Sequence, residues 1–174
     1  MAARLSRRSA ARRRRLFLEQ LEIRSLLAVV SWDGGAGTLN WNDALNWSGN
    51  VLPTTVDDVI VDIAGTNTVA STGSVSIRSL NSNETVSVTA GNFTVGGNLS
   101  GTGTLRVGGG NVTLTGTNWT SSEKLQVDSG TLALGGSFTP TSVGFVSGVM
   151  DPARFGRTGG TVNVTGSINL AGDN

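Results

Sequence analysis

The chain has 174 residues, among them 25 glycines, and contains neither cysteine nor histidine. It therefore lacks disulfides, thiolate metal sites and a cysteine nucleophile, as well as the usual general base and zinc ligand. Residues 1–28 hold eight arginines and two glutamates, whereas residues 29–174 hold five cations and ten acids, so we expect one mildly acidic folded unit that follows a basic tail.

The first segment, residues 1–28, reads MAARLSRRSAARRRRLFLEQLEIRSLLA. A secretory signal joins a basic start to about 7 to 15 uninterrupted apolar residues, but here Glu19, Gln20, Glu22 and Arg24 break the apolar part. We interpret the segment as an export or sorting address, helical or disordered. The alternatives are a mitochondrial-type transit peptide and a basic arm that binds nucleic acid.

Residues 12–28 resemble the N-terminal signature of large secreted and surface proteins of planctomycete bacteria. In that signature an arginine-rich start runs into the pattern Leu-Glu-x-Leu-Glu-x-Arg-x-Leu-Leu-Ala. The resemblance implies a protein that is exported to the cell surface or secreted. The matching residues are Leu18, Glu19, Leu21, Glu22, Arg24, Leu26, Leu27 and Ala28.

Residues 29–66 form a segment rich in tryptophan, with Trp32, Trp41 and Trp47 inside sixteen positions. One reading is an N-terminal cap, because the end of a repetitive β-fold exposes its core and terminal units are atypical. The other reading is an aromatic platform on which sugar rings stack. The segment resembles the one that opens β-solenoid regions of bacterial adhesin-like and autotransporter-like proteins, which favours the cap. The residues that carry this resemblance are Trp32, Gly34, Gly35, Trp41, Ala44, Asn46, Trp47, Pro53, Asp58, Val59 and Ile60.

Cation binding in the same segment has little support. Gly-Gly-Ala-Gly at 34–37 is similar to a calcium-binding nonapeptide, but Leu39 stands where that motif needs an aspartate, and the motif occurs once. Alternation along the expected strand places Asp58 and Asp62, which follow Asp57, on the same face as Ile60. We expect these acids to be solvated or hydrogen-bonded at a strand edge, and we predict no metal and no cofactor.

From residue 67 to 174 the chain repeats. Each copy reads strand, corner, glycine, strand and second corner, and successive full copies start 19, 20 and 30 residues apart. A period near 20 with short strands and glycine corners is typical of a right-handed parallel β-helix, a β-solenoid. The copies span residues 85–99, 104–118, 124–138 and 154–168, with a fainter one at 68–80.

The solenoid predicts columns of stacked side chains. Val88, Val107 and Val127 belong to one column, and Arg106 and Gln126 share an outward position above Ser87. The alternative fold is a β-sandwich, which would also alternate and turn at glycines but would not keep one register over four copies. The second apolar column comprises Val95, Leu114, Leu134 and Val164.

The ten extra residues between the third and fourth copies fall within 139–156, where we expect a loop or side excursion. The repeats resemble those of planctomycete surface proteins and of autotransporter passenger domains. The stretch SIRSL at 76–80, followed by ETVSVTAGNFTV at 84–95, is especially similar to the planctomycete repeats. We expect the sequence to be a fragment or a short relative of much longer proteins, with further solenoid coils as partners.

Catalysis is not predicted. Enzymes with a β-helix fold gather acids and cations on one outer face, and the charged residues of the repeats, namely Arg78, Arg106, Glu123, Lys124 and Asp128, form no acid pair. We predict a structural or adhesive segment of an exported bacterial surface protein that contacts surface polysaccharide or other surface proteins, without nucleic acid or a membrane span. The alternative is a carbohydrate-active β-helix that binds or cleaves polysaccharide, and acids converging in one groove would favour it.

Overall fold

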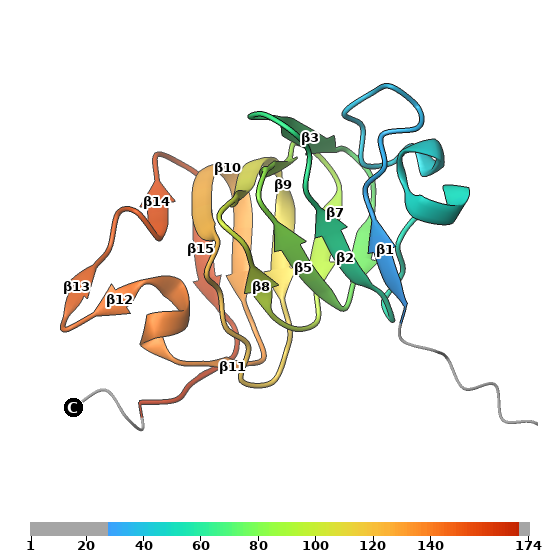
Figure 1. Ribbon diagram of the computed structural model, residues 1–174. Coiled ribbons are helices and arrows are strands. Elements are labelled where there is room, and N and C mark those ends of the chain that lie inside the picture. Colours follow the sequence, from blue (N-terminus) through green and yellow to red (C-terminus); the bar gives the residue numbers. More distant parts are fainter. Residues whose placement is uncertain (1–27, 171–174) are drawn as a thin grey trace, which may run out of the picture.

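Alternating apolar and polar residues, interrupted by glycine corners, fold the chain into a parallel β-solenoid (Figure 1). The computed structural model describes residues 28–170. The predicted export segment lies outside the described residues except for Ala28. The all-β fold class is confirmed: strands of successive coils stack in parallel about 20 residues apart.

Each coil turns corners between short strands that pair with their equivalents above and below. One coil consists of β5 (Ser79–Ser82), β6 (Thr85–Val88) and β7 (Asn92–Val95). The next begins with β8 (Leu99–Ser100), and its β9 (Thr104–Leu114) continues around a corner, pairing first with β6 and then with β7. The same path is followed by β10 (Lys124–Leu134), which pairs with β9 along its length.

The strands form sheets that run along the solenoid axis. The first sheet has the order β1-β2-β5-β8, with β1 at Val29–Ser31 and β2 at Asp58–Val61. The second has the order β14-β10-β9-β6-β3, and β4, β7 and β15 join it around the corner. The remaining elements are β3 (Thr68–Ser71), β4 (Val75–Ile77), β10 (Lys124–Leu134), β11 (Ser137–Phe138), β12 (Phe145–Val146), β13 (Val149–Met150), β14 (Phe155–Arg157), β15 (Thr161–Val164), β16 (Ser167–Ile168) and the 3₁₀ turns η1 (Ala44–Asn46), η2 (Ser48–Asn50) and η3 (Pro140–Val143).

The predicted columns are present, and every member except the exposed Val164 is buried in the core. Val107 pairs with Val88 on one side and with Val127 on the other, and all three side chains are buried. The second column runs in register from β7 to β15. All of these pairs are parallel, whereas a sandwich pairs its strands antiparallel, so the pairing rules out the sandwich. The paired residues of the second column are Val95, Leu114, Leu134 and Val164.

The corners need glycine where coils approach each other most closely. Gly136 has a φ of +63°, and a Cβ there would lie 1.9 Å from the carbonyl oxygen of Gly116 in the coil below. Gly37 has a similar φ of +68°, but a Cβ there would meet no atom within 4 Å. Substitution of Gly37 therefore tests backbone strain alone, whereas substitution of Gly136 adds steric overlap between coils.

We expect Gly37→Ala to lower the free energy of unfolding by about 1 to 2 kcal/mol, which is the cost of a left-handed backbone in an L-residue. Gly136→Ala should cost about 1 to 3 kcal/mol more, because the added methyl group overlaps backbone of the next coil. Urea unfolding of both variants measures the difference. Equal losses in the two would show that close coil contact does not dictate glycine at this corner.

The two ends of the solenoid differ. At the N-terminal end β1 covers the edge of β2, and Asn40 bridges to Ala70 on β3. At the C-terminal end the excursion predicted at 139–156 contains η3 and the antiparallel hairpin β12–β13, which extends beyond the last coil in Figure 1. Phe145 and Met150 of this hairpin line an apolar cavity of about 450 Å³ together with Ile168 and other residues of the last coil.

Candidate functional site

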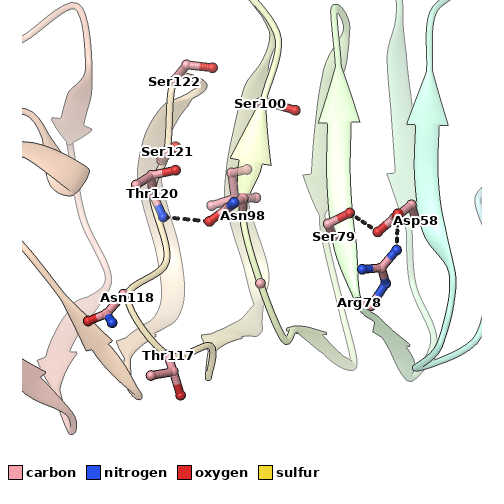
Figure 2. A pocket seen from close by; sticks show the side chains of 12 residues that line it. Asp58, Arg78, Ser79, Asn98, Ser100, Thr117, Asn118, Thr120, Ser121 and Ser122 are labelled. Atoms are coloured by element: carbon pink, nitrogen blue, oxygen red, sulfur yellow. Dashed lines mark hydrogen bonds and ion pairs between the residues drawn. The ribbon is translucent and has the colours of Figure 1, made fainter. Parts of the chain in front are cut away.

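A polar groove of about 670 Å³ crosses the outer face of the first sheet (Figure 2). It spans four successive coils, from β2 through β5 and β8 to the irregular segment at 117–122. Three strand spacings give it a length of about 14 Å along the axis. Its lining consists of Asp58, Arg78, Ser79, Gly97, Asn98, Leu99, Ser100, Thr117, Asn118, Thr120, Ser121 and Ser122.

The strand alternation explains why this face is polar. Leu80 and Leu99 pair with each other and point into the core, where they are 0% and 1% exposed. The residues beside them, such as Ser79 and Asn98, therefore point outward. Because the coils are in register, these outward residues form rows that run along the axis.

A compact ion pair occupies the N-terminal end of the groove. Arg78 Nη2 donates a hydrogen bond to the Asp58 carboxylate, and Ser79 Oγ donates to its other oxygen. Ser79 is the direct register partner of Asp58 on the next coil. The carboxylate and the guanidinium thus neutralise each other, and the rest of the lining carries no charge.

Amides and hydroxyls continue the groove toward the C-terminal end. Asn98 Oδ1 accepts a hydrogen bond of 2.9 Å from the Thr120 backbone N–H, as Figure 2 shows. Ser122 Oγ donates to the Gly101 carbonyl at 3.2 Å. These bonds join neighbouring coils and fix the orientation of the side chains, which present both donors and acceptors.

The three predicted tryptophans come together, but in the core. Trp32, Trp41 and Trp47 are 8%, 1% and 0% exposed. Trp47 contacts both other rings edge-on, with ring centroids 5.0 and 4.6 Å apart, and Trp41 packs on Phe93 of β7. Sugar stacking needs an exposed ring face, which this packing leaves almost entirely covered.

A buried amide, that of Asn46, holds the loop around these rings. Asn46 is fully buried; its Oδ1 accepts from the Ala36 backbone N–H, and its Nδ2 donates to Thr38 Oγ1 and to the Asn40 carbonyl. The position of Asn46 between Ala44 and Trp47 in the opening motif was the only signal in the sequence.

Asp57 and Asp62 of the entry segment accept hydrogen bonds from different residues and do not share a ligand. Asp57 accepts bonds of 2.7 Å from the backbone N–H and the hydroxyl of Thr54, whereas Asp62 accepts one of 3.3 Å from Asn83. Within residues 28–170 no three acids come close enough to hold a metal ion. This placement agrees with the expected hydrogen-bonded strand edge.

A second charged cluster lies outside the groove, on β9 and β10. Arg106 and Gln126 occupy the same row, as predicted, and both donate to Asp128. Hydrogen bonds from Thr158 first, and then from Arg106 and Gln126, lower the pKa of Asp128 to about 2. Thr158 belongs to the coil beyond the excursion, so its contact with Asp128 was not foreseeable from local spacing.

Glu123 is the most deeply buried acid among the described residues. Glu123 is 0% exposed, and its Oε1 accepts a bond of 3.1 Å from the Ser82 backbone N–H, two coils below. Burial raises the pKa of Glu123 to about 9, against the lowering effect of backbone hydrogen bonds from Ser82 and Ser100. In the coil between them Gly103 packs so tightly on Glu84 that a Cβ would lie 2.1 Å from its carbonyl oxygen.

Comparison with known family models, curated proteins and solved structures finds no match to this chain. No helix in the described part of the chain is long and apolar enough to cross a membrane.

Proposed function

We propose that this chain is a non-catalytic segment of an exported bacterial surface protein, in which the β-solenoid is a structural or adhesive element. The observation that carries the proposal is the groove: eight of its twelve lining residues are serine, threonine or asparagine, and register pairs link its four coils. Such a surface offers many weak polar contacts on a stiff scaffold, which suits adhesion and display.

In the carbohydrate-active alternative, hydrolysis of a polysaccharide requires two carboxyl groups on one face, separated by roughly 5 to 10 Å. The groove is lined by a single acid, Asp58, which is held by Arg78 and Ser79. Glu123 is buried and does not line the groove. The groove therefore lacks the acid pair that an enzyme of this class needs, and this favours the non-catalytic role.

Export is supported by the arginine-rich start and the Leu-Glu-x-Leu-Glu-x-Arg-x-Leu-Leu-Ala pattern that follows it. In a planctomycete host, the full chain with a C-terminal epitope tag should reach the cell surface or the medium. The double variant Leu26→Asp/Leu27→Asp should stay inside the cell, because it disrupts two fixed positions of the pattern. Fractionation with protease treatment of intact cells measures the location.

Ser25→Ala is the matched control, since it changes a variable position of the same pattern and should leave export intact. Retention of the unmodified chain in the cytosol would overturn the proposal. Export of the Leu26→Asp/Leu27→Asp variant at the normal level would remove the N-terminal pattern as its support.

A further inference from the structure

We infer that the groove over β2, β5 and β8 binds an extended, neutral polysaccharide that lies along the solenoid axis. This inference rests on the proposed adhesive function, because it names the ligand class of the same face. Three properties of the groove lead to it: its charge, the arrangement of its hydrogen-bonding groups, and the pairing of its strands.

The charge of the groove favours a neutral ligand. Asp58 and Arg78 are paired with each other, and the other polar lining residues are serine, threonine and asparagine. A polyanion such as nucleic acid is held by cations that neutralise its phosphates, and this lining supplies no cation beyond the paired Arg78. Anionic ligands are therefore disfavoured.

The hydrogen-bonding groups lie in rows with a regular repeat. Asp58 pairs with Ser79, and the pairs Leu80–Leu99 and Leu99–Ser121 place Asn98 and Thr120 on the same line one and two coils further. Figure 2 shows these side chains in succession across the groove. Neighbouring members are about 4.8 Å apart, so a chain of linked sugar rings lying along the row meets a hydroxyl or amide at each coil. Hydroxyls and amides both donate and accept, as sugar hydroxyls do.

The strand pairing disfavours a peptide ligand. A peptide that adds a strand needs an open sheet edge, with pockets for its side chains. The groove lies on the face of the sheet, where β2 is already paired with β1 and β5, and β5 with β2 and β8. The one large apolar residue in the lining, Leu99, is 1% exposed. The face therefore offers a peptide neither backbone partners nor apolar pockets.

Affinity electrophoresis of the full chain through gels that contain hydroxyethylcellulose, glucomannan or dextran tests the inference. At least one of these neutral polysaccharides should retard the protein, and alginate, a polyanion, should not. The double variant Asn98→Ala/Thr120→Ala should weaken the apparent affinity at least fivefold, because it removes two consecutive members of the row. The matched control is Thr94→Ala/Thr113→Ala, a register pair on the outer face of β7 and β9, which should leave retardation unchanged.

Asn98→Ala also removes the bond to the Thr120 backbone, so each variant is checked by thermal unfolding. If the double variant does not fold, Ser100→Ala replaces it, because the Ser100 hydroxyl makes only a long bond of 3.5 Å to Leu80. No retardation by the three neutral gels, retardation by alginate alone, or equal loss in groove and control variants would overturn the inference. A chain that is exported but not retarded would leave the proposed function standing, whereas a chain that is retarded but not exported would contradict the proposed function alone.

Discussion

Replacing Trp47 with alanine should destabilise the protein by about 3 to 5 kcal/mol, a large part of the stability of an ordinary domain. Trp47 is fully buried and is the central ring of the cluster, in contact with Trp32 and Trp41. Its indole N–H also donates a 2.8 Å bond to the Trp41 carbonyl. The substitution therefore leaves a cavity and an unpaired buried acceptor at the closed end of the solenoid.

Chemical denaturation followed by circular dichroism measures this loss. Leu45→Ala is the control, because Leu45 lies two residues away and is 53% exposed, so its removal should change the free energy of unfolding by less than about 0.5 kcal/mol. Similar stabilities for Trp47→Ala and the unmodified chain would show that the tryptophan cluster does not secure the N-terminal end.

Glu123→Gln should stabilise the protein at pH 8 and flatten the dependence of its stability on pH. The folded state holds the Glu123 proton up to a pKa of about 9, whereas the unfolded chain releases it near the ordinary value of 4.5. Between these values the folded state binds more protons, so the contribution of Glu123 to stability is full below pH 4.5 and is lost as pH rises toward 9. The slope is roughly 1 kcal/mol per pH unit.

Urea unfolding at several values between pH 5 and pH 9 measures this slope, and the Gln variant should lose most of it. Glu84→Gln is the control: Glu84 is also buried, and its carboxylate accepts a 2.6 Å bond from the Asn67 backbone N–H. That variant should keep the slope, because Glu123 is still present. An unchanged slope in Glu123→Gln would place the responsible group elsewhere.

The repeat was predictable because a solenoid imposes its geometry locally and repeatedly. The register of Val88, Val107 and Val127 follows from alternation within each copy, and the spacing of the copies excludes a sandwich once the pairs are seen to be parallel. The short spacing of the tryptophans in the sequence also predicts that they cluster, but it does not predict how exposed each ring is. A ring can face solvent or core at the same position in the sequence, and only the packing of Trp41 on Phe93 decides it.

The groove and the buried acid depend on relations between coils that spacing alone does not reveal. The groove continues past β8 into the segment at 117–122, which forms no regular strand, so its last row cannot be read from alternation. In the sequence, nothing distinguishes Glu123 from the other charged residues of the repeats. Its carboxyl group instead accepts a bond from the Ser82 backbone two coils below, a contact that alternation within one copy does not reveal.

The two ends of the solenoid differ in how firmly they hold the coils next to them. Each coil is stabilised by its immediate neighbours, so the protein behaves as a linear array in which order spreads from one unit to the next. The closed end, where Trp41 packs under Phe93, is a fixed origin for that order. At the other end of the described residues Val164 and Ile168 are 54% and 46% exposed. A ligand that bridges several coils would therefore couple units that otherwise interact only with their immediate neighbours.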